Sequence, residues 1–221
     1  MQGLYVILNH THQSPKEMLH LCRQVLRGGA DIVQYRNKQG HRAQILPIAM
    51  ELASLCHEAD VPFLLNDYPQ WVEDVGADGA HIGQQDLSIA EARMYVGPER
   101  LLGVSASHPK AARAAEQQGA DYVGCGHVFA TTTKPKGFEP IGVDGLAAVV
   151  RSVGIPVFAI GGIFVERVGK IVSMARPAGI VLVSALSFSE DPASVCKECK
   201  ELLLTRDFKR TKPLSMSTKS T

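Results

Sequence analysis

Residues 29–36 have the sequence Gly29-Ala30-Asp31-Ile32-Val33-Gln34-Tyr35-Arg36. The Gly-Ala-Asp triplet that precedes this β-branched run recurs at Gly76-Ala77-Asp78 and Gly119-Ala120-Asp121, with a degraded copy at Pro177-Ala178-Gly179. Each glycine follows an amphipathic stretch, where a left-handed C-cap lets the chain turn into the next strand. The repeat therefore predicts helix, turn and strand in succession, with one copy before every second strand.

Along the rest of the sequence, short apolar runs alternate with longer amphipathic stretches. The eight predicted strands are residues 3–8, 32–36, 62–66, 80–82, 101–104, 122–124, 157–160 and 180–183. Helical patterns fall between them, near 15–28, 41–59, 69–75, 88–95, 108–118, 143–153, 165–173 and 190–204. This alternation predicts the α/β class and a single (β/α)8 TIM barrel over residues 1–204. A doubly wound open sheet is the alternative fold.

Composition excludes several classes of protein. The 221 residues carry a formal net charge of +1, which argues against a surface that binds nucleic acid. There is no apolar run of about 18 residues and no export signal, so a cytoplasmic protein without a membrane partner is expected. Residues 205–221 are expected to form a disordered basic tail. Cys196 and Cys199 are expected on one late helix, Cys196 half buried and Cys199 near solvent.

Polar residues concentrate where the second, third and fourth predicted strands end. Strand alternation puts Gln34, Arg36 and Lys38 on one face, and Tyr35 and Asn37 on the other. The third strand ends in Asn66-Asp67, and Asp86 follows the fourth. Carboxylates from neighbouring strand ends can share Mg²⁺, which prefers oxygen ligands. The alternative is that Asp67 and Asp86 each cap a helix.

A second anion site is predicted from the later strands. Ser105 ends the fifth strand, and the loop after the sixth carries Thr131, Thr132, Thr133 and Lys134. The seventh strand leads into Gly161-Gly162 and the eighth into Val183-Ser184. Loops after the last two strands of this fold often bind phosphate through backbone N–H groups.

These strings together resemble the thiamine phosphate synthase and thiazole tautomerase superfamily, and within it the synthases. The likeness runs in order from about residue 3 to residue 204. It implies an Mg²⁺-dependent transferase that joins 4-amino-2-methyl-5-(diphosphooxymethyl)pyrimidine to a thiazole phosphate and releases diphosphate. The implied mechanism is dissociative, the implied partners are these small molecules, and a homo-oligomer is left open.

The resemblance also implies roles for individual residues. The pyrimidine diphosphate would be held by Gln34, Arg36, Lys38, Asn66, Ser105 and Lys134, and the metal by Asp67 and Asp86. The thiazole phosphate would be held by Thr131, Thr133, Gly162, Val183 and Ser184. Tyr35, Asn37 and Thr132 stand in the same strings and are included among the substrate-binding residues. Arg36, Lys38, Ser105 and Lys134 are expected to act in catalysis.

Two other functions are kept open. His127 stands where many synthases have proline, and the string Gly126-His127-Val128-Phe129 resembles the tautomerase relatives. A tautomerase-type enzyme would use His127 as acid and base. A non-catalytic barrel that binds a phosphate ligand is the other alternative, and it predicts an incomplete set of charges. His81 is expected to be a hydrogen-bonded residue of the barrel.

Overall fold

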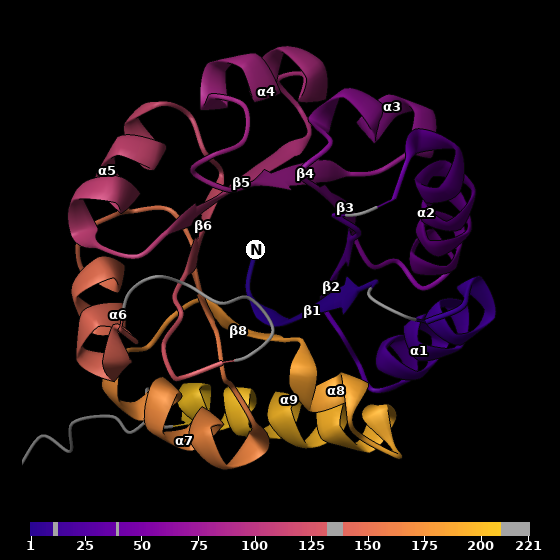
Figure 1. Ribbon diagram of the computed structural model, residues 1–221. Helices are drawn as coiled ribbons and strands as arrows, with labels where there is room; N and C mark the ends of the chain where they lie inside the picture. Colours follow the sequence, from indigo (N-terminus) through magenta and orange to yellow (C-terminus); the bar gives the residue numbers. More distant parts are fainter. Residues whose placement is uncertain (11–12, 39, 132–138, 209–221) are drawn as a thin grey trace, which may run out of the picture.

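The computed structural model describes residues 1–10, 13–38, 40–131 and 139–208. Its strands are parallel and form a closed barrel in sequence order, with β1 paired to β8 (Figure 1). They are β1 (Gly3–Asn9), β2 (Ile32–Arg36), β3 (Phe63–Asn66), β4 (Gly79–Ile82), β5 (Leu101–Ala106), β6 (Tyr122–Cys125), β7 (Val157–Ile160) and β8 (Gly179–Leu182). The predicted (β/α)8 barrel is therefore confirmed, and the open sheet was the wrong alternative.

The helices surround the strands as an outer ring (Figure 1). They are α1 (Pro15–Arg27), α2 (Arg42–His57), α3 (Val72–Val75), α4 (Ile89–Val96), α5 (Pro109–Gln117), α6 (Gly142–Val150), α7 (Val165–Met174), α8 (Ser184–Ser187) and α9 (Pro192–Phe208). Within the described part of the chain, no helix has the length and apolar character needed to cross a bilayer.

Some predicted helix bounds were wrong. The segment near 69–75 is a 3₁₀ turn, η1 (Pro69–Trp71), followed by α3. A single turn of helix as short as α8 gives no periodic signal, and it was not predicted. The last helix, α9, continues through Phe208, past the expected start of the tail at residue 205. The rest of that tail, residues 209–221, lies outside the described residues.

The Gly-Ala-Asp repeats build the same contact three times at the amino-terminal ends of the strands. In each, the aspartate carboxylate accepts a hydrogen bond from a strand amide, and the aspartate amide donates to the carbonyl of that same strand residue. The pairs are Asp31 with Leu4, Asp78 with Phe63, and Asp121 with Leu102, at N···O distances of 2.7–2.9 Å. We call each pair an aspartate clasp; each ties a strand to the one before it.

The aspartate of each clasp also pairs with a basic side chain. The degraded fourth copy of the repeat has no aspartate and so forms no such pair. Asp31 pairs with Lys200, Asp78 with His57 and Asp121 with Arg93, at 2.7–3.0 Å. In the fourth copy Gly179 takes the place of the aspartate. A Cβ there would lie 1.9 Å from the carbonyl oxygen of Gly3, so the close approach of β1 and β8 leaves no room for a side chain.

Apolar side chains fill the barrel interior near the amino-terminal ends of the strands. This inner cluster contains Tyr5, Ile32, Leu64, Tyr122, Phe158 and Val181. Its three aromatic rings meet edge to face, with centroids 5.5–6.0 Å apart. A larger cluster lies between the strands and the helices. The base of the barrel is thus closed by packing, and only its carboxyl-terminal end is left for a ligand.

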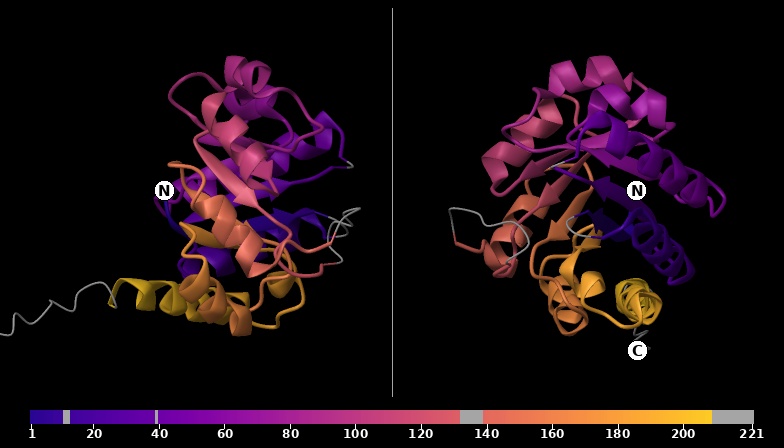
Figure 2. Two further views of the ribbon diagram at one scale, coloured as in Figure 1. Left: turned by 90° about the vertical axis from the view of Figure 1, so that its left-hand side faces the viewer. Right: turned by 45° about the vertical axis from the view of Figure 1, so that its right-hand side comes forward.

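The exposure predicted for two cysteines was wrong, because both Cys196 and Cys199 are fully buried. Figure 2 shows α9 lying along the barrel beside α7. This helix also contacts α1 and β1, so more than one of its faces is covered. Burial raises the pKa of both thiols, to about 12 in each case. Cys22, Cys56 and Cys125 are buried as well.

The aspartate clasps predict a stability effect. Asp121→Ala should lower the free energy of unfolding by about 1–2 kcal/mol, because the Leu102 amide loses its side-chain acceptor and Arg93 loses its ion pair. Urea unfolding measures this change. Glu99→Ala, at an exposed position between α4 and β5, is the matched control and should change stability by less than about 0.5 kcal/mol. Equal losses in the two variants would contradict a structural role for the clasp.

Candidate active site

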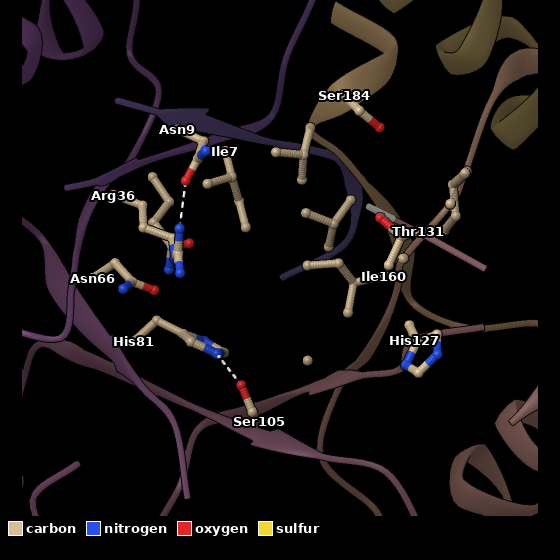
Figure 3. A pocket seen from close by; sticks show the side chains of 17 residues that line it. Ile7, Asn9, Arg36, Asn66, His81, Ser105, His127, Thr131, Ile160 and Ser184 are labelled. Atoms are coloured by element: carbon tan, nitrogen blue, oxygen red, sulfur yellow. Dashed lines mark hydrogen bonds between the residues drawn. The ribbon is translucent and has the colours of Figure 1, made fainter. Parts of the chain in front are cut away.

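A cavity opens at the carboxyl ends of the strands (Figure 3) and encloses about 820 Å³, counting its open mouth. Because side chains alternate along a strand, every second residue of the barrel points into this space. The lining residues are Ile7, Asn9, Gln34, Arg36, Asn66, His81, Ser105, Gly124, His127, Thr131, Ile160, Gly161, Gly162, Ile163, Val181, Val183 and Ser184. The position matches the active-site end of this fold.

One wall of the cavity carries polar groups from β1, β2 and β3. Arg36 Nη1 donates a hydrogen bond to Asn9 Oδ1 at 2.5 Å, drawn as a dashed line in Figure 3. Asn66 Nδ2 is buried without an acceptor among the described residues. The amide of Gln34 lies beside the Tyr5 hydroxyl, but neither of its polar atoms reaches hydrogen-bond geometry with a described residue. Buried polar atoms without partners are costly, so this wall is suited to a polar ligand.

A chain of hydrogen bonds connects the floor of the cavity to the inner cluster. His81 bonds through Nε2 to Ser105 Oγ and through Nδ1 to the Tyr122 hydroxyl, both at 3.0 Å. The Tyr122 and Tyr5 hydroxyls are 2.8 Å apart. Burial raises the pKa of both phenols, so both stay protonated near neutral pH. His81 is thus hydrogen-bonded within the barrel, as expected, and it also lines the cavity.

The two predicted metal ligands, Asp67 and Asp86, interact with each other, and neither is among the residues that line the cavity. Asp67 and Asp86 follow β3 and β4, and their carboxyl groups are close enough to hydrogen-bond to each other. Lys38 Nζ lies 2.9 Å from Asp67 Oδ2. Burial raises the pKa of Asp67 and the neighbouring Asp86 raises it further, against the opposing effect of Lys38. Ionisation of Asp67 is therefore less favourable than it is in water, and a cation shared with Asp86 would offset that cost.

Helix capping does not account for either aspartate. The N-cap of α4 is Ser88, in a capping box with Glu91, while Asp86 accepts a hydrogen bond from the Gly83 amide at 2.6 Å. No side chain caps η1 or α3. Asp67 also has a φ of +68°, which is uncommon for a residue with a side chain and is concentrated at functional sites. These observations favour the metal-binding interpretation of the pair.

The opposite wall contains the described residues that were predicted to form a second anion site. Gly161 and Gly162 have φ of +104° and +62°, and a Cβ at Gly162 would lie 2.5 Å from the Ala130 carbonyl oxygen. Two loops therefore approach each other through glycine backbone. Thr131 and Ser184 lie on this side of the cavity in Figure 3. Thr132, Thr133 and Lys134 lie outside the described residues, so their predicted roles stay predictions.

Three residues that were predicted to bind substrate at the end of the second strand, Tyr35, Asn37 and Lys38, do not line the cavity. The strand ends at Arg36, so alternation does not extend to Lys38, which pairs with Asp67 instead of lining the cavity. Tyr35 bonds through its hydroxyl to His10 Nδ1 at 3.0 Å and to Asn37 Nδ2 at 3.3 Å. Asn37 Oδ1 also accepts from the Gly40 amide. Tyr35 and Asn37 would therefore affect binding only indirectly, by holding the conformation of the loop after β2.

Sequence reasoning missed Asn9 and Tyr68. Asn9 ends β1 directly after an apolar run, and this polar residue at a strand end was an available signal. Tyr68 donates a hydrogen bond to the Asn37 carbonyl at 3.2 Å and stacks on Trp71. Its pKa is raised by burial and by the nearby charge of Asp67, which places its hydroxyl close to the carboxylate pair.

Comparisons with known proteins agree with this geometry. The family model described as thiamine monophosphate synthase matches residues 4–186. A thiamine-phosphate synthase of Chloroflexus aurantiacus is 38% identical over 200 residues, 90% of this chain and 92% of its own. One from Salinibacter ruber is 39% identical over 86% of this chain and 83% of its own.

A solved structure of the same family has the same barrel. Thiamine phosphate pyrophosphorylase from Pyrococcus furiosus superposes with a TM-score of 0.83 at 32% identity, over 93% of this chain and 96% of its own. A 3-hexulose-6-phosphate synthase from Salmonella typhimurium, at 18% identity and a TM-score of 0.70, shares the fold alone. From the family match, the identity to these relatives and the superposition, the chain belongs to the thiamine monophosphate synthase family.

Proposed function

We propose that this chain joins 4-amino-2-methyl-5-(diphosphooxymethyl)pyrimidine to a thiazole phosphate and releases diphosphate, in a dissociative reaction that needs Mg²⁺. Family membership supports the synthase reaction. The observation that carries the metal-dependent mechanism is the contact between Asp67 and Asp86, with Lys38 bonded to Asp67, directly after the lining residues Arg36 and Asn66 in the chain.

Asp67 and Asp86 fit the requirements of Mg²⁺ and would hold it. Two carboxylates, with further oxygens from substrate phosphates and water, form the usual set of ligands for this ion. Among the described residues no group of three or more His, Cys, Asp or Glu could hold a metal, so the proposed site would need further oxygen ligands from the substrate and water. When bound, the ion supplies positive charge to the diphosphate group.

Arg36 and Lys38 would bind the diphosphate from the protein side. In the proposed reaction the bond between the methylene carbon and the diphosphate oxygen breaks, and its electron pair leaves with the diphosphate. The thiazole nitrogen then donates its lone pair to the pyrimidine-methyl cation, so no protein nucleophile is needed. Fixed cations placed where negative charge develops lower the barrier without reorganisation.

The remaining residues would orient the two heterocycles. Gln34, Asn66 and Ser105 offer amide and hydroxyl groups on the wall and floor that a pyrimidine ring can hydrogen-bond. Thr131, Gly162, Val183 and Ser184 line the opposite wall and would take the thiazole phosphate. The two substrates would thus approach from opposite sides of one cavity. A cytoplasmic location and a homo-oligomer stay predictions.

The carboxylate pair predicts a large effect of an isosteric change. Asp67→Asn should lower diphosphate release at least about 100-fold, because it removes a charged oxygen ligand while keeping the size of the side chain. The assay mixes both substrates with Mg²⁺ and measures diphosphate. Circular dichroism and urea unfolding check that the variant is folded.

Asp74→Asn is the matched control, because Asp74 is an exposed aspartate that pairs with Arg42 on the outside of the barrel. It should leave diphosphate release unchanged. Wild-type rates from folded Asp67→Asn would contradict the metal assignment. No diphosphate release by the wild type would favour the non-catalytic alternative, although the described part of the charge set is complete.

A tautomerase-type activity is the second candidate, because His127 lines the cavity on the side of Thr131 and Gly161 (Figure 3). A histidine there could move a proton on the thiazole ring near neutral pH. His127→Asn should then slow isomerisation of thiazole phosphate by about 10²–10⁴-fold, measured by NMR without the pyrimidine substrate or Mg²⁺. His108→Asn, in the N-cap of α5, is the control. No isomerisation by the wild type would reject this candidate.

A further inference from the structure

Arg167 connects the two loops that form the second anion site. It lies in the first turn of α7, and its guanidinium donates a hydrogen bond through Nη1 to the Gly162 carbonyl oxygen. The guanidinium carbon also lies 4.6 Å from the ring centroid of Phe129 and 5.7 Å from that of Phe164. Phe129 belongs to the loop after β6 and Gly162 to the loop after β7. One side chain therefore bridges both loops while standing outside the cavity lining.

The bond to Gly162 fixes the direction of the next amide. The peptide between Gly162 and Ile163 is trans, so its C=O and N–H groups point in opposite directions. Because Arg167 is not among the lining residues, a carbonyl turned toward it leaves the Ile163 N–H directed to the opposite side, where Gly162 and Ile163 line the cavity. No described residue accepts a hydrogen bond from the Gly162 or Ile163 amide. These two donors are left for a ligand.

The loop would not hold this shape by itself. Gly161 and Gly162 both lie in the left-handed region, and glycine has more backbone freedom to lose than any other residue. The Gly161 carbonyl accepts from the Phe129 amide at 3.0 Å, which anchors the first peptide of the loop to the neighbouring loop. Arg167 supplies the corresponding anchor for the second peptide.

The position of this cation is unfavourable without an anion nearby. A positive side chain in the first turn of a helix opposes the helix dipole, which favours negative charge at that end. The adjacent Glu166 is exposed, and Arg167 forms no ion pair with a described carboxylate. A phosphate bound at Gly162 and Ile163 would be attracted by both the dipole and the guanidinium.

We propose that Arg167 is a positioning residue that holds the Gly161-Gly162-Ile163 loop with its amides toward the cavity and so sets the affinity for the phosphate of the thiazole substrate. The inference rests on the proposed placement of that phosphate on Gly162 and Ser184. It requires no contact between Arg167 and either substrate. Its effect should therefore appear in the KM of one substrate only.

The test compares steady-state kinetics of Arg167→Met, Arg167→Lys and wild type, with each substrate varied in turn. Arg167→Met keeps much of the side-chain volume without the charge or the donors, and it should raise the KM for thiazole phosphate about tenfold. The kcat and the KM for the pyrimidine diphosphate should change less than about twofold. Arg167→Lys keeps the charge but not the planar stacking group, and it should fall between Arg167→Met and wild type.

Arg93→Met is the matched control, because Arg93 also bonds backbone carbonyls, those of Gly97, Arg100 and Gly119, but lies away from the cavity. It should lower the unfolding temperature and leave both KM values unchanged. Ser184→Ala tests the phosphate site itself, and it should raise the KM for thiazole phosphate whether or not Arg167 matters.

The outcomes separate the two proposals. A raised KM in Ser184→Ala with wild-type values in Arg167→Met overturns the role of Arg167 alone. Unchanged values in both variants overturn the phosphate site, and with it the inference. A loss of kcat, or an equal rise of both KM values, in Arg167→Met indicates general disruption and also overturns the inference. If Arg167→Met does not fold, Arg167→Lys decides by the same change in one KM.

Discussion

The pairing of β1 with β8 closes the barrel, and the geometry of the site depends on that closure. Gly3 lies opposite Gly179 in this pair, at a distance that excludes any side chain at Gly179. Closure makes every strand present alternate residues to one enclosed interior. It also leaves no sheet edge. Apolar residues take the inward positions near the base, and polar residues from β1 to β5 take them near the carboxyl ends, so side chains from several strands face one small volume.

Charge is distributed unevenly around this volume. Arg36 ends β2, and Lys38, Asp67 and Asp86 follow β2, β3 and β4. The walls from β7 and β8 offer mainly glycine backbone, a serine and aliphatic side chains. Burial raises the pKa of Asp67 and the neighbouring Asp86 raises it further, so a cation beside the two carboxylates would stabilise their ionised forms. A divalent cation with a diphosphate suits that side, whereas a single phosphate suits backbone amides. The asymmetry of charge therefore matches the asymmetry of the two substrates.

The sequence was sufficient for the barrel and for about half of the lining residues, because both follow from local signals. Strand alternation predicts that Gln34 and Arg36 point inward together, and the Gly-Ala-Asp repeat predicts where every second strand begins. The failures involve contacts between distant segments. The alternation rule ends with the strand, so it could not show that Lys38 turns to Asp67. Nothing near Cys199 indicates that α9 is covered by both α1 and α7. The bond from Arg167 to Gly162 likewise depends on how a helix turn meets a loop.

The hydrogen-bond chain on the floor indicates which part of a substrate lies deepest. Tyr5 and Tyr122 both keep their protons, because burial raises the pKa of each phenol. Each hydroxyl has one proton to donate, so the chain from Tyr5 through Tyr122 and His81 to Ser105 runs in one direction. If Tyr122 donates to His81 Nδ1, neutral His81 donates from Nε2, and the Ser105 proton is free for the cavity. In that direction, the floor presents a neutral hydroxyl donor. A neutral ring nitrogen suits such a floor better than a diphosphate, whose charges would be costly to bury there. In the proposed reaction the pyrimidine ring would therefore occupy the interior, with its diphosphate directed toward Lys38 and the metal held by Asp67 and Asp86.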